Sequence, residues 1–111
     1  MQRDQAHLTD ILLSARRAMD YLADKQKEDF LNDQQCQDAV VRRLEIIGEA
    51  ARRVSEATRL SLPGLPWTSL IGMRNILIHE YDGIDLAIVW ETVQKDLPTL
   101  VAVLQPFAPS E

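Results

Sequence analysis

Glycine and proline are almost absent from long stretches of this sequence, which leaves room for long helices. They gather in the segment 63–66 and otherwise stand alone at 48, 72, 83, 98, 106 and 109. Between them apolar residues recur three and four positions apart, and we find neither a period-two alternation nor an internal repeat. At 111 residues the chain has the length of one domain. The sequence predicts an all-α, up-and-down bundle of four to five helices in a single domain spanning residues 1–111.

The first half of the chain holds two expected helices. Apolar positions from Leu8 to Leu22 form one helical stripe, which predicts an amphipathic helix of roughly 20 residues. Phe30 falls in the connection that follows, and a second helix runs from an N-cap at Asp33 to about Thr58.

The second half is divided by its turn residues. A third helix is expected to begin at Pro66 or Trp67 and to continue to about Ile78, before a turn at Asp82-Gly83. Asp85 can cap a fourth helix, in which Pro98 marks either a kink or the first turn of a fifth helix. Residues 105–111 are expected to form a frayed tail.

Charge and cysteine usage exclude several classes of function. The net charge of −5 argues against a broad nucleic-acid surface, although residues 39–74 hold six arginines and only three glutamates. Any polyanion site should therefore be local and built from arginine. Cys36 has no disulfide partner, and with only His7 and His79 beside it no metal-ligand spacing exists, so no metal or cofactor is expected. No apolar run could span a membrane or act as a leader, which predicts a soluble, cytoplasmic protein.

Arg74 is the most unusual residue of the third helix. On a straight helix it falls within the apolar stripe, near Leu70 and Ile78. Because a buried guanidinium needs a partner, Arg74 requires either a carboxylate such as Glu45 or Glu49, or a pocket that binds a ligand. Spacing alone leaves these two alternatives equally open.

His79 and Tyr81 follow Arg74 closely. Tyr81 returns to the face of Arg74 on a straight helix, whereas His79 can join them only if the helix loosens near Ile78. Taken alone, His79 fits a helix-capping role as well as a catalytic one.

Residues 74–81 read R-N-x-x-x-H-x-Y, and this spacing resembles the signature of HEPN-domain proteins, specifically the HepT-like toxins. Two longer blocks extend the resemblance: RRLEIIGEAA at 42–51 and LPWTSLIGMRNILIHEYDGIDLAIVW at 65–90. DLPTL at 96–100 is similar to the closing helix of the family. The resemblance covers about residues 39–104.

The resemblance implies a HEPN bundle that dimerises around the motif and acts as a metal-independent endoribonuclease toxin. RNA is the implied substrate, with tRNA as one candidate. The implied catalytic residues are Arg74, which would stabilise the phosphate, and His79, which would transfer protons. Asn75 and Tyr81 would support them, and Glu45 or Glu49 could orient Arg74.

The resemblance also implies partners. One chain supplies one motif histidine, so a homodimer would provide both an acid and a base, and we expect a broad apolar surface on the second and third helices to associate. A minimal nucleotidyltransferase antitoxin would complete a toxin–antitoxin pair of type II-like or type VII-like organisation. That partner is implicated in nucleotidylylation of Tyr81, which would place a bulky anion beside Arg74.

Several other residues have simpler interpretations. Glu49–Arg53 and Arg52–Glu56 are expected to form exposed ion pairs one turn apart. Gly48 and Gly72 lie inside expected helices and suggest close approach of a neighbouring helix. Cys36 is expected in the core.

Two rival functions remain at this stage. The first is a HEPN module that docks on a nucleotidyltransferase and has no catalysis of its own. The second is a plain helical interaction protein, which leaves Arg74 unexplained. The trio Arg74, His79 and Tyr81 favours the enzyme, because a docking module does not need it.

Overall fold

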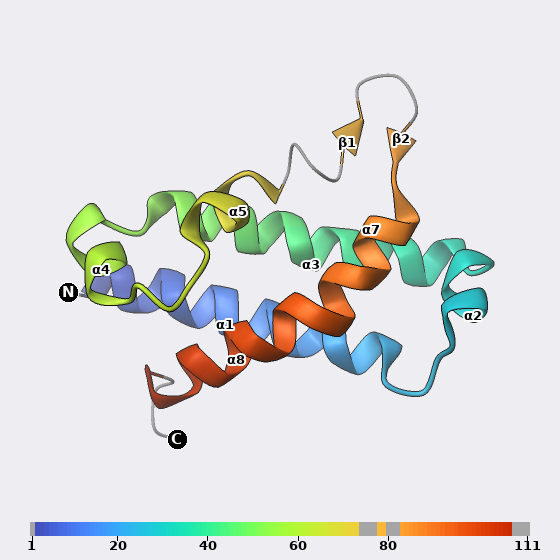
Figure 1. Cartoon of the computed structure of the whole chain (residues 1–111), viewed down its shortest axis with the longest axis horizontal. Helices are drawn as coiled ribbons and strands as arrows, with labels where there is room; N and C mark the ends of the chain where they lie inside the picture. Colours follow the sequence, from blue (N-terminus) through green and yellow to red (C-terminus); the bar gives the residue numbers. More distant parts are fainter. Residues whose placement is uncertain (1, 74–77, 80–82, 108–111) are drawn as a thin grey trace.

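The computed structural model describes residues 2–73, 78–79 and 83–107, and these residues form an all-α bundle (Figure 1). The fold class predicted from the sequence is confirmed. The helices are α1 (Gln2–Leu22), α2 (Lys27–Leu31), α3 (Gln34–Arg53), α4 (Glu56–Ser61), α5 (Trp67–Ile71), α7 (Leu86–Glu91) and α8 (Leu97–Leu104), with a π-helical turn η1 (Thr92–Asp96) and a 3-10 turn η2 (Gln105–Phe107). Two short strands, β1 (Ile78–His79) and β2 (Gly83–Ile84), pair in antiparallel fashion.

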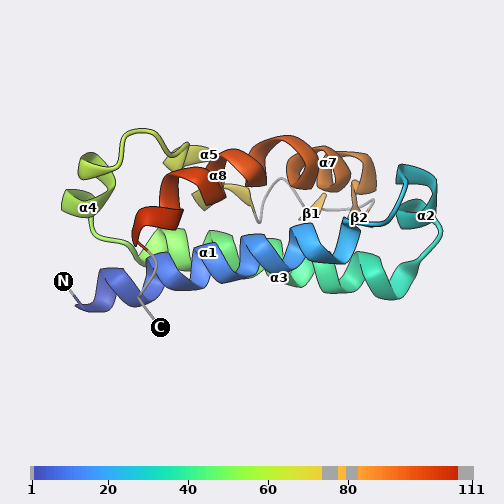
Figure 2. The same cartoon turned by 90° about the horizontal axis from the view of Figure 1, so that it is seen from below.

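The bundle has two layers. Helices α1 and α3 run side by side in opposite directions and form one layer, while α5, α7, η1 and α8 cover it as the other (Figure 2). Apolar side chains repeat every third or fourth position on each of these helices, so their burial on the shared inner side drives the packing. The largest fully buried side chains come from all parts of the bundle: Ile11, Leu12, Phe30, Leu44, Ile47, Val89, Leu97, Leu100 and Leu104.

The start of α3 agrees with its sequence and its end does not. The Asp33 carboxylate accepts a hydrogen bond from the Cys36 backbone N–H at 3.0 Å, which confirms the predicted N-cap. The helix was expected to reach Thr58, but it ends at Arg53, and Val54 is extended. Ser55 then caps the new helix α4, because its hydroxyl accepts a bond from the Thr58 N–H.

The connection after α1 contains more structure than its sequence predicted. Phe30 lies in the short helix α2 and is fully buried. Its ring packs against that of Trp90 in α7, with 5.8 Å between the ring centroids. This contact joins α2 to α7 at the end of the bundle where the chain passes from α1 to α3.

The third expected helix is shorter than predicted. It ends at Ile71, and the Gly72 N–H closes it by donating to the Thr68 carbonyl at 3.0 Å. A Cβ at residue 72 would lie only 3.2 Å from that carbonyl oxygen, so glycine suits this end. Ile78, expected in the helix, instead pairs with Ile84 across the two strands. Gly72 is thus a helix terminator, and not a residue inside a helix.

The C-terminal helix continues through Pro98 with a local change of pitch. The Asp85 carboxylate accepts bonds from the N–H groups of Ala87 and Ile88, which confirms the predicted cap. Pro98 cannot donate a backbone hydrogen bond, and the preceding turn widens to a π-helix in which the Leu97 N–H donates to the Thr92 carbonyl. Of the two predicted alternatives, the first turn of a further helix is confirmed: Pro98 lies in the first turn of α8, directly after the π-turn.

The segment after α8 is ordered as far as the structure describes it. We expected a frayed tail from residue 105, but Gln105–Phe107 forms a 3-10 turn against α1. The Gln5 side-chain amide donates to the Phe107 carbonyl at 2.6 Å, and Arg16 donates to the Gln105 side chain. Residues 108–111 lie outside the described residues.

Other sequence expectations concern Cys36 and membranes. Cys36 is half-buried beside the core, and burial raises the pKa of its thiol, so a packing role is confirmed. Across the described residues, we find no helix whose length and apolarity would let it cross a membrane.

A buried carboxylate joins the first turn of α1 to the break between α3 and α4. One oxygen of Asp4 accepts the Ser55 backbone N–H at 3.0 Å, and the other accepts the hydroxyls of Ser55 and Thr58 at 2.6 and 2.5 Å. These hydrogen bonds favour the charged form and lower the pKa of Asp4 to about 2.

We predict that Asp4→Asn destabilises the protein at neutral pH, since an amide N–H₂ would face groups that donate hydrogen bonds. The pKa of Asp4 is lower in the folded chain than in the unfolded one, so its contribution to stability is present above the ordinary Asp pKa and is lost as the pH falls towards about 2. Thermal unfolding should therefore separate the two proteins at neutral pH and bring them together near pH 2.

Asp10→Asn is the matched control, because Asp10 is an exposed aspartate of the same helix. It should unfold as the unmodified protein does at both pH values. A melting difference for Asp4→Asn that stays constant down to pH 2 would contradict the assigned role.

Candidate active site

The motif identified in the sequence spans residues 74–81, which follow α5 and precede α7 in the chain. The structure describes the backbone of His79 within strand β1, where His79 pairs with Gly83 of β2. Arg74, Asn75 and Tyr81 lie outside the described residues. The described residues therefore define how the motif is held at its two ends and at His79.

The backbone at His79 differs from the expectation. A loosened helix was expected there, whereas Ile78 and His79 are extended and pair with Ile84 and Gly83. Arg74 and Tyr81 were expected to share one face of a helix that continues through Ile78. Because Ile78 lies in a strand, that argument no longer holds. The strand pair, which rises from the edge of the bundle in Figure 1, now sets the backbone of His79.

Two buried residues anchor the chain before the motif. Met73 and Leu70 are both buried in the core. In addition, the Trp67 indole N–H donates to the Leu62 carbonyl at 2.9 Å, which fixes the start of α5 to the preceding loop. The motif therefore begins at a firmly packed point, and Asp85 at the start of α7 caps the helix that follows it.

Trp67 and Trp90 stand on either side of the motif in the sequence. Both are partly buried and pack against the core. Trp90 also contacts Phe30, as described above. Both rings therefore contribute to core packing beside the motif.

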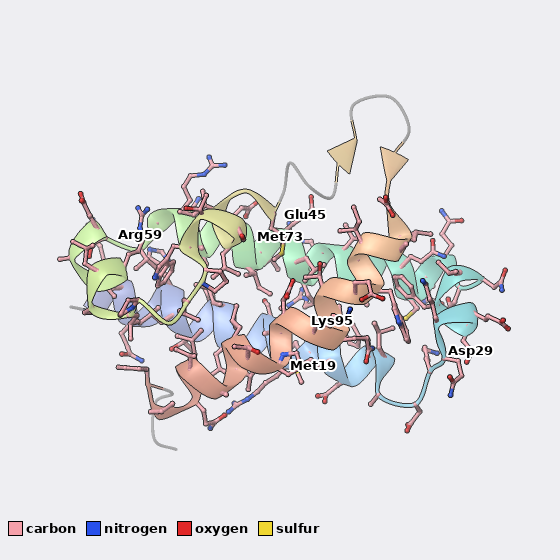
Figure 3. All side chains as sticks on the ribbon, in the orientation of Figure 1. Met19, Asp29, Glu45, Arg59, Met73 and Lys95 are labelled. Carbon is pink, nitrogen blue, oxygen red and sulfur yellow. The ribbon has the colours of Figure 1, made fainter. Side chains whose placement is uncertain are left out.

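Glu45 and Glu49 were predicted as carboxylates that could orient Arg74. Both lie on α3, the helix on which α5 packs. Glu45 is half-buried and lies in the same part of the molecule as Met73 in Figure 3, whereas Glu49 is exposed. Of the two, Glu45 is the half-buried carboxylate, and Figure 3 shows it towards Met73, the last described residue before the motif.

The expected ion pairs of this region do not form among the described residues. The ion pairs found among all the described residues lie elsewhere, and they are Lys25–Asp33 at 3.8 Å and Lys95–Glu91 at 2.9 Å. Arg52–Glu56 is excluded because the helix breaks at Val54, so these two residues do not share a helix. Glu49 and Arg53 share α3 but stay apart, and both are exposed.

The surface beside the strand pair includes a shallow hollow of about 410 Å³ along α7 and η1. Its ionisable lining consists of Asp85, Glu91 and Asp96 against one lysine, Lys95. Because three carboxylates outweigh one ammonium group, this hollow is unsuited to bind RNA phosphates. Among the described residues, no group of three His, Cys, Asp or Glu side chains is placed to hold a metal ion.

Sequence reasoning missed the strand pair and the anchor at Met73. The signal for the strands was available in the isoleucines at 78 and 84, which are β-branched, and in Gly83 between them. Met73 follows Gly72 directly, and a helix-ending glycine followed by an apolar residue often marks a return of the chain to the core. Met73 directly precedes the motif, β1 lies within it, and β2 follows it.

Comparison with known protein families supports the resemblance seen in the sequence. Residues 11–107 match the model of the family described as "Ribonuclease HepT-like", which includes the whole motif. The chain belongs to the HepT-like ribonuclease family.

Individual relatives are similar over most of their length. The chain is 42% identical over 96 residues to "Putative RNase MJ1380" of Methanocaldococcus jannaschii, covering 86% of this chain and 88% of that one. It is 45% identical over 73 residues, 66% of each chain, to "Probable ribonuclease HepT" of Thermococcus cleftensis. A "Putative RNase TTE0752" of Caldanaerobacter subterraneus subsp. tengcongensis is 37% identical over 100 residues, 90% of this chain and 89% of its own. No solved structure matches the chain. These names support ribonuclease activity.

Proposed function

We propose that this protein is a metal-independent endoribonuclease toxin in which Arg74 and His79 act on RNA. The observation that carries this proposal is the match of residues 11–107 to the HepT-like ribonuclease family, with R-N-x-x-x-H-x-Y present at 74–81. The toxin–antitoxin pairing, the partner and tRNA as one candidate substrate follow from the resemblance of the sequence. The reaction would take place in the cytoplasm.

The reaction needs few groups. The ribose 2′-hydroxyl attacks the neighbouring phosphorus, the bond to the 5′-oxygen breaks, and the products are a 2′,3′-cyclic phosphate and a free 5′-hydroxyl. A base must remove the proton from the 2′-hydroxyl, and an acid must protonate the departing 5′-oxygen. The imidazole of His79 can do either at neutral pH, and the fork of Arg74 can hold two phosphate oxygens as charge develops.

A homodimer would supply the second proton-transfer group. One chain has a single motif histidine, so the acid and the base would come from two copies related by a two-fold axis. Asn75 and Tyr81 would add hydrogen bonds to the phosphate or to His79, and Glu45 would orient Arg74.

The antitoxin would be a minimal nucleotidyltransferase. Transfer of a nucleotide monophosphate to the Tyr81 hydroxyl, with release of pyrophosphate from the nucleoside triphosphate, would place a fixed anion close to Arg74 in sequence. That anion would compete with RNA phosphate for the guanidinium group.

The alternative is a HEPN module that docks on a nucleotidyltransferase without catalysis. The experiments on His79 and Arg74 separate it from the enzyme. If docking were the only function, the unmodified protein would cleave RNA no faster than background, and neither substitution would change that rate.

We expect His79→Ala to lower the rate of RNA cleavage by at least about a hundredfold, because general acid–base groups contribute on the order of 10² to 10⁴. The rate of cleavage of a labelled RNA measures this. Helical circular dichroism and molecular mass should stay unchanged. His7→Ala is the matched control, since His7 is the other histidine of the chain and lies on α1. Equal activity of the two variants would contradict the catalytic role of His79.

Arg74→Lys tests the guanidinium fork. Lysine keeps the positive charge but cannot bind two phosphate oxygens in one plane, so we expect a loss of most of the cleavage rate with unchanged stability. If Arg74 only balances the charge of Glu45 or Glu49, lysine should be tolerated and Arg74→Ala should lower the free energy of unfolding. Arg17→Lys, at an exposed position of α1, controls for the exchange itself.

Tyr81→Phe tests the modification. Coexpression with the neighbouring nucleotidyltransferase should add one or more nucleotide-monophosphate masses to the unmodified chain and none to Tyr81→Phe, as measured by intact mass spectrometry. Tyr21→Phe is the matched control at the other tyrosine of the chain, which is also exposed. It keeps Tyr81 and should therefore still be modified. An adduct that persists in Tyr81→Phe, or full inhibition of a chain that carries no adduct, would leave steric docking as the means of inhibition.

A further inference from the structure

The segment that leads to the motif has the opposite charge to the rest of the chain. Residues 50–73 hold Arg52, Arg53 and Arg59 against a single acid, Glu56, which gives a net charge of +2. The whole chain carries −5, so the other residues together carry −7. The arginine excess noted between residues 39 and 74 is therefore concentrated in the part that directly precedes the motif.

The three arginines gather at one end of the bundle. Arg52 and Arg53 lie in the last turn of α3 and are exposed. Arg59 lies in α4, and its Nε–H donates to the carbonyl of Val54, the residue after Arg53, at 3.0 Å. This bond holds the stem of Arg59 against the end of α3 without using its terminal N–H groups. We call Arg52, Arg53 and Arg59 the arginine end.

No carboxylate forms an ion pair with the arginine end within the described residues. The ion pairs found there involve two lysines, both elsewhere in the fold. Asp4 comes close through Ser55, but it is buried and its oxygens already accept three hydrogen bonds. Arg3, exposed beside it in the first turn of α1, offsets its charge. The three guanidinium groups are therefore available to an anion.

Two hydroxyl groups continue this surface towards the motif. Thr68 and Ser69 lie in α5, which packs on α3, and both are exposed. Guanidinium and hydroxyl groups are among the side-chain donors that bind the phosphate oxygens of nucleic acids. The donors of this surface therefore suit a chain of phosphates.

The arginine end lies close to the point at which the motif begins. Arg52 follows Glu45 by seven residues, or about 10 Å along α3, and lies within about 20° of it around the helix. Glu45 is the carboxylate shown towards Met73, and Arg59 lies further along, at the α4 end of the molecule (Figure 3). An RNA strand bound at the motif would therefore reach the arginine end with nucleotides close to the cleaved bond.

The other flank of the motif disfavours phosphates. Elements α7 and η1 follow the motif and line the hollow that carries Asp85, Glu91 and Asp96 against Lys95. A strand bound at the motif meets opposite charge on the side of α3, α4 and α5 and like charge on the side of α7. This difference sets the direction in which the strand continues.

We infer that the arginine end, with the hydroxyls of α5, binds the RNA phosphates that flank the cleaved bond, so that the strand leaves the motif over α5 and α4. The identity of the ligand rests on the proposed function. Arg52, Arg53 and Arg59 are positioning residues, which hold the substrate and touch neither the reacting phosphorus nor the 2′-hydroxyl. Because their contacts go to the RNA backbone, they select no base.

A protein partner fits this surface less well. The core of a contact between proteins is apolar, and among the described residues Leu60 is the only large hydrophobic side chain exposed between positions 50 and 73. The described parts of α3 and α5 expose none, which corrects the expectation of a broad apolar surface on the second and third helices. Charge and not apolar area therefore dominates at the arginine end.

Double charge reversal tests the arginine end. The probe is a labelled single-stranded 2′-O-methyl RNA of mixed sequence, longer than about 16 nucleotides, which 2′-hydroxyl attack cannot cleave. Arg52→Glu combined with Arg53→Glu should raise its dissociation constant by about tenfold or more. The slope of log Kd against log salt should fall by about 1.4, or about 0.7 for each lost phosphate contact. Fluorescence anisotropy measures both.

Arg17→Glu combined with Lys27→Glu is the matched control. Both residues are exposed on other elements, and the pair changes the net charge by the same amount. This variant should bind the RNA almost as tightly as the unmodified protein. Circular dichroism verifies that each variant is folded, and Arg52→Gln combined with Arg53→Gln repeats the test without a reversed charge.

Substrate length separates positioning from catalysis. With a cleavable RNA of the same length, the loss caused by Arg52→Glu and Arg53→Glu should appear in KM and not in kcat. A dinucleotide has no flanking phosphate, so the loss should be confined to the long RNA. An equal loss for both substrates would mean that the two arginines only support the fold, and it would overturn the inference.

The outcomes separate this inference from the proposed function. Binding of the 2′-O-methyl RNA that depends on the arginine end, in a protein that cleaves no RNA, would support the inference and overturn the proposed function. Cleavage that depends on His79, with equal RNA binding by both double variants, would overturn the inference alone. The arginines would then only stabilise helix ends or bind an acidic protein. A protein that binds no RNA would overturn both.

Discussion

The antiparallel packing of α1 against α3 is the constraint on which the rest of the structure depends. These are the two longest helices of the described chain, and their inner sides bury an apolar stripe along almost their full length. Small side chains of these two helices, among them Ala15, Ala18 and Ala51, are fully buried, which lets neighbouring backbones approach closely. The second layer packs onto this pair, and α5 reaches its position only because α3 presents a continuous surface.

Local ends of helices then decide where chemistry can occur. Gly72 stops α5 after little more than one turn. Buried Met73 before the motif and the cap at Asp85 after it are the described points between which the motif residues occur in the sequence. A rigid scaffold on both sides of a functional segment can position its residues.

The sequence was sufficient for features that depend on neighbouring residues. The caps at Asp33 and Asp85 are confirmed because each needs only the N–H groups of the next few residues. The place of Pro98 in the first turn of α8 is also local, because the first N–H groups of a helix need no partner within it. The motif was recognisable as a short linear pattern, although its described backbone at His79 is a strand and not the end of a helix.

Features that depend on distant residues were missed. The break after Arg53 places Ser55 against Asp4, a contact 51 positions apart that no helical periodicity contains. For the same reason the pair Arg52–Glu56 was expected and does not form. The π-turn before Pro98 was also not expected from the sequence, and it lies where η1 packs on α1.

The contact between Gln5 and Phe107 places the first turns of α1 beside the last described turn of the chain. The path of the described backbone is therefore nearly a closed ring, with the start of α1 and the end of α8 towards the same end of the bundle (Figure 1). A short linker could join these turns, and the ring could then be opened at the exposed loop around Pro63 and Gly64. Such a circular permutant would keep α5, the strand pair and α7 in their present order, so the topology around the motif does not depend on where the chain begins.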